Sequence, residues 1–238
     1  MKRVIVIPAR YASSRLPGKP LALIAGKPLI RWVYESASGS TLKDEILIAT
    51  DDARIQEAAR SFGANVVMTS ADCASGTDRV FEAVKGCDAD SIVNVQGDEP
   101  LVRGDMIDGL FSALEKEPID MATLCSPLSD KNELTDPHTV KVVFDHQGFA
   151  LYFSRSPIPF MQKSTDVTPY KHIGVYGFSR SFLETFVSLP KGKLEEAESL
   201  EQLRALEAGH KIRVLVTDYH GISVDTIDDL ERARSILA

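Results

Sequence analysis

The sequence lacks any long run of apolar residues. Its longest runs, VIVI at 4–7 and LALIA at 21–25, are far shorter than the roughly 20 residues that a membrane-spanning helix needs. The first three residues, MKR, are typical of a secretory signal, but Pro8, Arg10 and Arg15 interrupt the apolar segment that would have to follow. We therefore expect a cytoplasmic protein with no membrane partner.

Cysteine is also scarce. Only Cys73, Cys87 and Cys125 are present, and no two of them have C-x-x-C spacing. An odd number of cysteines in a chain of 238 residues excludes a disulfide-held scaffold and predicts reduced, buried thiols.

Several familiar catalytic and nucleotide-binding motifs are missing. Lys19 and Lys27 are each followed by proline rather than Ser or Thr, so neither belongs to a Walker A loop. The G-x-G-x-x-G, G-x-S-x-G and H-E-x-x-H patterns are absent as well. The ordinary kinase, dehydrogenase and hydrolase interpretations therefore lose most of their support.

Excess positive charge is absent too. The 27 Lys and Arg against 34 Asp and Glu leave a formal net charge of −7, which argues against a nucleic-acid partner. Any anionic ligand must therefore be bound by a local basic cluster.

What is present is an alternation of short apolar strands with amphipathic helices. This rhythm predicts one α/β domain over 1–238, with a mostly parallel sheet covered by helices. From about 130 to 190 the rhythm changes to an antiparallel excursion with a hairpin, a proline-rich loop at 157–170 and another strand. The predicted strands are 3–9, 45–50, 65–69, 91–95, 121–126, 140–145, 149–154, 172–178 and 211–217, and the predicted helices are 28–38, 51–62, 76–85, 104–116, 196–208 and 226–237.

A local basic cluster follows the first predicted strand. Arg10, Arg15 and Lys19 lie within ten residues, among small and turn-forming residues. Parallel sheets bind ligands at the carboxyl ends of their strands, and guanidinium groups suit phosphate geometry. The cluster predicts a cradle for a polyphosphate, with a solvated basic loop as the alternative.

Two carboxylates also follow strands. Asp98, in the QGDEP turn after strand 91–95, is a candidate Mg²⁺ ligand, because Mg²⁺ usually takes one or two carboxylates together with water and phosphate oxygens. Asp225 is the second candidate, with an N-cap on the last helix as its equal alternative. Asp51 and Asp52, by contrast, are interpreted as capping residues of helix 51–62.

Seven segments, in this order, resemble the 3-deoxy-manno-octulosonate cytidylyltransferase (CMP-Kdo synthetase) family over essentially the whole chain. They are IPARYASSRLPGKPL, TSADCASGTDR, VNVQGDEPL, ALYFSRSPIP, HIGVYGF, ESLEQLRAL and SVDT. The resemblance implies a three-layer α/β/α nucleotidyltransferase fold and a homodimer whose interface lies in the antiparallel excursion. It also implies transfer of CMP from CTP to the anomeric 2-hydroxyl of an eight-carbon sugar acid (Kdo), which activates the sugar for lipopolysaccharide synthesis. Sialic acid cytidylyltransferases share the architecture but have a different first loop.

The resemblance further implies a role for each matching residue. Lys19, Asp98 and Asp225 would be catalytic, and Asp98 and Asp225 would hold Mg²⁺, with a second ion brought by CTP. The implied nucleotide-binding residues are Arg10, Arg15, Lys19, Ser75, Gly76 and Arg79, and the implied sugar-binding residues are Gln96, Arg155, His172, Tyr176, Glu201 and Gln202.

Without the resemblance, plainer interpretations stay open for the sugar-side residues. Arg155 could be structural, and His172 could be a packing residue. Glu201 and Gln202 could both lie on the solvated polar face of an amphipathic helix. Two other functions also remain open: a sugar-1-phosphate nucleotidyltransferase that uses another base, and a nucleotide sensor without catalytic activity.

Overall fold

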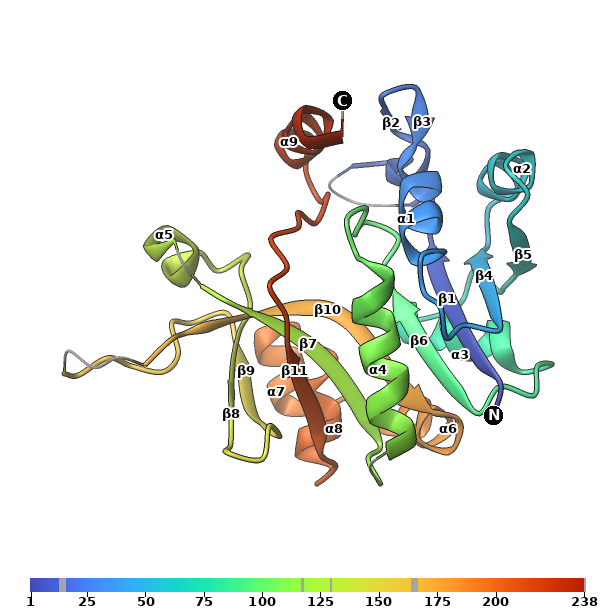
Figure 1. Cartoon of the computed structure of the whole chain (residues 1–238). Coiled ribbons are helices and arrows are strands. Elements are labelled where there is room, and N and C mark those ends of the chain that lie inside the picture. Colours follow the sequence, from blue (N-terminus) through green and yellow to red (C-terminus); the bar gives the residue numbers. More distant parts are fainter. Residues whose placement is uncertain (13–15, 117, 129, 164–166, 238) are drawn as a thin grey trace. The chain divides into compact units, whose positions relative to one another are not determined.

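The computed structural model describes residues 1–12, 16–116, 118–128, 130–163 and 167–237 (Figure 1). The chain divides into two compact units. Unit 1 comprises Met1–Phe111 and Gly221–Ala238, and unit 2 comprises Ser112–His220. Helix α4, Gly104–Lys116, contains the point where the chain passes from unit 1 to unit 2.

Unit 1 is built on parallel strands. They run in the order β6 (Ser91–Val95), β1 (Arg3–Ala9), β4 (Glu45–Thr50) and β5 (Asn65–Met68). Each neighbouring pair is parallel, and Val4 of β1 lies opposite Glu45 on one side and Ile92 on the other. Helices α1 (Leu29–Ala37), α2 (Ala53–Ser61) and α3 (Gly76–Val84) pack against these strands.

Burial on both faces explains why the sequence of the central strand is uniformly apolar. Val4, Ile5, Val6 and Ile7 of β1 are all fully buried. A strand that is covered by helices on both faces cannot alternate with polar residues. The predicted α/β class with a mostly parallel sheet is confirmed.

Unit 2 contains the predicted antiparallel strands. Strand β7 (Met121–Pro127) lies between β11 (Ile212–Val216), which is parallel to it, and β10 (Tyr170–Ser179), which is antiparallel. Strand β8 (Lys141–Phe144) pairs with β10 and forms a hairpin with β9 (Ala150–Ser154). The helices of this unit are α5 (Lys131–Thr135), α6 (Arg180–Ser188), α7 (Lys193–Glu198) and α8 (Leu203–Glu207).

The prediction of one continuous helix over 196–208 is wrong. The chain forms α7 and α8, and Ser199 between them has a φ of 52°, in the left-handed region that ends helices. Leu200, in the segment between the two helices, and Leu203, at the start of α8, are nevertheless buried, so the apolar spacing still reaches the core without a continuous helix. Helices α5 and α6 were not predicted.

The cysteine prediction holds in part. None of the three cysteines forms a disulfide, but only Cys125 is buried, whereas Cys73 and Cys87 are partly exposed. Within the part of the chain that the structure describes, no helix has the length and apolarity to cross a membrane.

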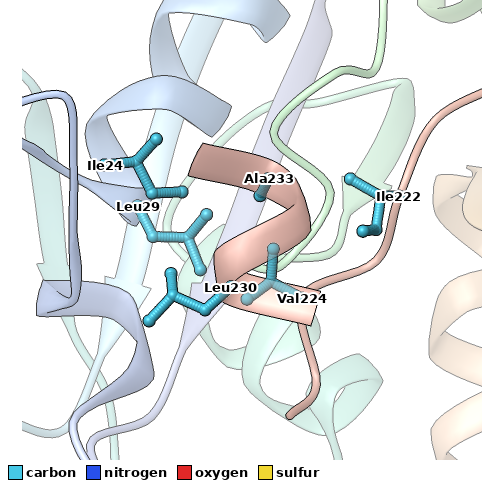
Figure 2. Close-up of a cluster of buried hydrophobic side chains, with 6 residues drawn as sticks. All are labelled: Ile24, Leu29, Ile222, Val224, Leu230 and Ala233. Carbon is cyan, nitrogen blue, oxygen red and sulfur yellow. The ribbon is translucent and has the colours of Figure 1, made fainter. Parts of the chain in front are cut away.

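The C-terminal segment belongs to unit 1 and is anchored there by an apolar cluster. Helix α9 (Ile227–Leu237) packs near the short 3-10 helix η1 (Lys19–Leu21) and the ribbon of β2 (Leu23–Ile24) and β3 (Lys27–Pro28). Figure 2 shows side chains of α9 and of the segment before it close to Ile24 and Leu29. The cluster consists of Ile24, Leu29, Ile222, Val224, Leu230 and Ala233.

We predict that Leu230→Ala lowers the free energy of unfolding by about 2–5 kcal/mol, because Leu230 is 6% exposed and its removal leaves a cavity in this cluster. The matched control is Ile236→Ala on the same helix, at a side chain that is 56% exposed, which should cost less than about 0.5 kcal/mol. Urea denaturation of both variants measures the difference. Equal losses would show that α9 is not anchored through this cluster.

Candidate active site

Three charged side chains from distant parts of the chain meet in unit 1. The ammonium nitrogen of Lys19 lies 2.6 Å from Oδ2 of Asp98 and 3.0 Å from Oδ1 of Asp225. These two aspartates are 79 and 206 residues away from Lys19 in the sequence. Both carboxylates therefore converge on one cation, as their predicted shared role requires.

A close approach of the backbone positions Asp98. The turn after β6 passes over the end of β1, where a Cβ atom built on Gly97 would lie 2.8 Å from the carbonyl oxygen of Pro8. Only glycine fits such a contact without a shift of the backbone. The carbonyl oxygen of Asp98 also accepts a hydrogen bond of 2.9 Å from the backbone N–H of Val224. The backbone of Asp98 is thus joined directly to that of Val224, the residue before Asp225.

Asp225 is not the cap of the last helix. The hydroxyl of Thr226 accepts a hydrogen bond from the backbone N–H of Asp229, and the Asp229 carboxylate accepts one from the N–H of Thr226. This reciprocal pair is a capping box in which Thr226 is the N-cap. The capping alternative for Asp225 is therefore wrong, and its carboxylate points instead to Lys19.

The two aspartates keep Lys19 charged. Its side chain is only 13% exposed, and desolvation by itself would lower the pKa of the ammonium group. The attraction of Asp98 and its hydrogen bond, followed by those of Asp225, outweigh desolvation and raise this pKa above its usual value. Lys19 is therefore a permanent cation at neutral pH.

The same pair of carboxylates could hold a hard dication. Their oxygens converge on one position, and oxygen is the donor that Mg²⁺ prefers in proteins. No group of three or more His, Cys, Asp and Glu side chains suited to a metal ion occurs within the described ranges. One or two carboxylates with water and substrate phosphates are the usual ligands of Mg²⁺, so the residues present fit this ion.

One hydrogen bond brings Arg10, from the loop after β1, to the segment just before Ser75 and Gly76. The Arg10 guanidinium donates a hydrogen bond of 2.7 Å to the carbonyl oxygen of Cys73. Ser75 is the N-cap of α3, where its hydroxyl accepts from the backbone N–H of Asp78. Gly76 begins this helix, and Arg15 lies outside the described residues.

Gln96 lies close to Gly76 in unit 1. A Cβ atom built on Gly76 would be 3.6 Å from Oε1 of Gln96. The amide nitrogen of Gln96 donates a hydrogen bond of 3.3 Å to Oδ1 of Asn94, a fully buried residue whose Nδ2 has no described partner. Asn94 was not among the predicted site residues, although a polar residue inside the apolar strand SIVNV indicates a buried polar group.

Arg79 is completely buried. Its guanidinium lies 3.1 Å from the carboxylate of Asp51 and donates to the hydroxyl of Thr69, which ties α3 to the ends of β4 and β5. Asp52 is the N-cap of α2, as predicted, whereas Asp51 serves as the partner of Arg79. The nucleotide role of Arg79 stays a prediction.

In unit 2, Arg155 is bound mainly to backbone carbonyls. Its guanidinium donates to the carbonyl oxygens of Glu198 at 2.8 Å, Pro137 at 2.9 Å and Ser199 at 3.4 Å. The carbonyl of Arg155 itself accepts from the ammonium group of Lys141, whose side chain is fully buried. These contacts order the chain around Arg155, and its binding to a substrate stays a prediction.

His172 and Tyr176 lie together on β10. Their ring centroids are 5.4 Å apart, and the ring of Phe153 meets His172 edge-on at 5.0 Å. Burial lowers the pKa of His172 to about 3, so this side chain is neutral. Burial, with a smaller effect of the Glu201 charge, raises the pKa of Tyr176, which keeps its hydroxyl protonated.

Glu201 and Gln202 lie between α7 and α8 rather than on an amphipathic helix, so that part of the prediction is wrong. Gln202 is 2% exposed, and its Oε1 accepts a hydrogen bond of 3.1 Å from the hydroxyl of Tyr176. Its amide nitrogen has no hydrogen-bond partner within the described part of the chain. The structure therefore joins Tyr176 and Gln202, two of the predicted sugar-binding residues.

Sequence reasoning missed two further polar residues of unit 2. The Glu198 carboxylate accepts from the Ser154 hydroxyl at 2.6 Å and from the backbone N–H of Arg155 at 2.9 Å. Thr123, which is fully buried, lies 2.9 Å from Nε2 of His172 through its hydroxyl oxygen. The sequence signal for Thr123 was a polar residue between the apolar residues of β7. No nearby sequence feature indicated that its hydroxyl would contact His172.

We predict that His172 lowers the free energy of unfolding as the pH falls from about 6.5 to about 3. An unfolded histidine binds a proton below roughly pH 6.5, whereas the folded His172, among Phe153, Tyr176 and Thr123, does so only near its lowered pKa of about 3. In this window the unfolded state holds more protons, so acid favours unfolding. The free-energy advantage of the wild type over His172→Gln in urea denaturation should shrink as the pH falls from 7 to 4, and a constant advantage would contradict the prediction.

Comparison with known proteins identifies the family of this chain. The family model described as Cytidylyltransferase matches residues 4–212. The chain is 49% identical to the 8-amino-3,8-dideoxy-manno-octulosonate cytidylyltransferase of Shewanella baltica (strain OS195) and 50% identical to that of Shewanella frigidimarina (strain NCIMB 400), covering 100% of this chain and 99% of each relative. A solved structure of CMP:2-keto-3-deoxy-manno-octonic acid synthetase complexed with CTP is 44% identical, with a TM-score of 0.95 over 99% of this chain and 98% of that one. The chain belongs to the cytidylyltransferase family.

Proposed function

We propose that this cytidylyltransferase transfers CMP from CTP to the anomeric 2-hydroxyl of 3-deoxy-manno-octulosonate, an eight-carbon sugar acid, and releases pyrophosphate. The observation that supports this most is the convergence of Lys19, Asp98 and Asp225 in unit 1. The full-length similarity to enzymes named for octulosonate sugars supports the choice of sugar.

The reaction forms one bond and breaks one. The 2-hydroxyl oxygen of the sugar attacks the α-phosphorus of CTP, the bond to the bridging oxygen breaks, pyrophosphate leaves, and the hydroxyl proton passes to solvent. Such a displacement between negatively charged groups is accelerated by positioning and by positive charge. Lys19 supplies a fixed cation, and its two carboxylate partners hold its ammonium group in place.

We further propose that Asp98 and Asp225 hold Mg²⁺ when CTP is bound. The ion would supply positive charge beside the phosphates and lower the pKa of an attacking hydroxyl. Lys19, already held by both carboxylates, would then be displaced toward the phosphate oxygens, for which an ammonium group is a suitable partner.

Three of the unit 2 residues that are predicted to bind the sugar are polar and uncharged. His172 and Tyr176 carry no charge at neutral pH, and Gln202 has an amide nitrogen to donate. We propose that these residues bind hydroxyl groups of the sugar. We also propose that catalysis requires no side-chain general base, because neither the QGDEP segment nor the SVDT segment contains a histidine.

A second candidate substrate is the sugar with an amine in place of the hydroxyl at C8. Its support is that the Shewanella relatives, at 49% and 50% identity, are named for the 8-amino sugar, whereas the solved structure at 44% is named for the 2-keto-3-deoxy sugar acid. Both sugars share the anomeric carbon that reacts, so the same chemistry serves either.

We predict pyrophosphate release with CTP, Mg²⁺ and the octulosonate, and at least about tenfold less with ATP, GTP or UTP. A coupled pyrophosphate assay run with both C8 variants ranks the sugars by kcat/KM, and each tenfold ratio corresponds to about 1.4 kcal/mol. Pyrophosphate release with a sugar 1-phosphate in place of the sugar acid would indicate a sugar-1-phosphate nucleotidyltransferase. CTP binding in calorimetry without pyrophosphate release would indicate a sensor.

We predict that Asp98→Asn and Asp225→Asn each lower kcat by at least about a hundredfold, because each removes a negative charge from the site that holds Lys19 and the proposed metal ion. The matched control, Asp105→Asn, changes an exposed carboxylate of unit 1 that pairs with Arg103, and it should keep full activity. Melting temperatures measured alongside separate lost chemistry from lost folding. Unchanged turnover in either site variant would contradict the roles proposed for these carboxylates.

The homodimer implied by the resemblance also remains a proposal. Its expected interface is the antiparallel segment at about 130–190, and sedimentation at micromolar concentration gives the oligomeric state directly.

A further inference from the structure

A single buried hydroxyl in unit 2 faces three polar atoms of β10. The Thr123 oxygen lies 2.9 Å from the carbonyl oxygen of Val175, 3.3 Å from that of Ile173 and 2.9 Å from Nε2 of His172. Thr123 is fully buried. No water is therefore needed to explain how these groups are satisfied.

An irregularity in strand pairing creates this arrangement. Along β10 and β7, Ile173 pairs with Leu124, but the next pair is Tyr176 with Thr123, so two residues of β10 have no partner across the ladder. Such a bulge turns backbone carbonyls out of the regular hydrogen-bond pattern. The Thr123 side chain lies where it can satisfy them.

The single hydrogen of the Thr123 hydroxyl determines which tautomer the His172 imidazole adopts. A threonine hydroxyl has one hydrogen to donate, and both carbonyl oxygens can only accept. The hydroxyl donates to Val175, the nearer carbonyl, so toward His172 the oxygen acts as an acceptor. Nε2 of His172 must therefore carry a hydrogen.

The other ring nitrogen must then be bare. His172 lies against the rings of Phe153 and Tyr176, in surroundings that keep it neutral at physiological pH. A neutral imidazole carries one hydrogen, and here it is on Nε2. Nδ1 is left as a hydrogen-bond acceptor, with no partner within the residues that the structure describes.

We propose that Thr123 is a positioning residue that holds His172 with its hydrogen on Nε2, so that Nδ1 accepts a hydrogen bond from a donor group of the sugar. This rests on the proposed function for the identity of the ligand. A hydroxyl or ammonium group can make this bond, whereas the substrate carboxylate, which has no hydrogen at neutral pH, cannot. His172 is thereby assigned to a carbon of the sugar that carries a hydroxyl or ammonium group rather than to its acid group.

Nitrogen NMR of the intact protein tests the tautomer without any substrate. In a ¹⁵N-labelled sample, two-bond proton–nitrogen correlations distinguish a protonated from a bare imidazole nitrogen, and the spectrum of His172→Gln identifies His172 among the five histidines. We expect a protonated Nε2 and a bare Nδ1. The opposite pattern, or a doubly protonated ring at pH 7, would overturn the proposal.

Substitutions at Thr123 test whether its hydroxyl fixes the tautomer of His172. Thr123→Val removes the hydroxyl and should produce a mixture of tautomers, with KM for the sugar raised about tenfold and KM for CTP unchanged. Thr123→Ser keeps the hydroxyl and should restore both the spectrum and the KM. Thr185→Val, at an exposed threonine of α6, is the matched control and should change neither.

The outcomes separate this proposal from the proposed function. If the wild type shows the expected tautomer but releases no pyrophosphate with the octulosonate, the function fails while the role of Thr123 in the protein stands. If Thr123→Val leaves both the spectrum and the sugar KM unchanged, or raises both KM values equally, the positioning role is overturned. Should Thr123→Val not fold, the wild-type spectrum and Thr123→Ser still decide.

Discussion

Two carboxylates that share one ammonium group impose the central constraint on unit 1. Asp98 and Asp225 would repel each other at this separation, and Lys19 compensates their charge while being shielded from water itself. The arrangement survives because an apolar cluster around α9 and a backbone hydrogen bond from Val224 to Asp98 hold the C-terminal segment against the QGDEP turn.

The residues proposed to bind CTP and the residues proposed to bind the sugar differ in charge. Unit 1 presents fixed charges, which suit a triphosphate. In unit 2, two of the residues proposed to bind the sugar are neutral, because burial suppresses the charge of His172 and keeps Tyr176 protonated. Neutral donors and acceptors select hydroxyl groups by direction rather than by charge. Discrimination among sugars is therefore expected to depend on which nitrogen carries a hydrogen, a property that Thr123 determines.

Local structure could be predicted from the sequence wherever burial is uniform. The strands Arg3–Ala9, Glu45–Thr50 and Ser91–Val95 and the helix Gly104–Lys116 have the predicted bounds, since their apolar patterns match the period of the element. The prediction failed at Ser199, where the same leucine spacing continues through a left-handed residue. A pattern of apolar residues records which side chains are buried, but it does not record whether the backbone between them stays helical.

The sequence alone determined the α/β class, the phosphate-suited cation Lys19 and the position of Asp98 after a parallel strand, because these follow from periodicity and from residues adjacent in the chain. Only the tertiary structure decided whether Asp225 caps a helix or faces Lys19, since Thr226 is an equally suitable cap and the competing partner lies 206 residues away. The same holds for the hydrogen on His172, which depends on the hydroxyl of Thr123, 49 residues earlier in the chain. Contacts across such distances arise from how the strands pair, and no local pattern encodes them.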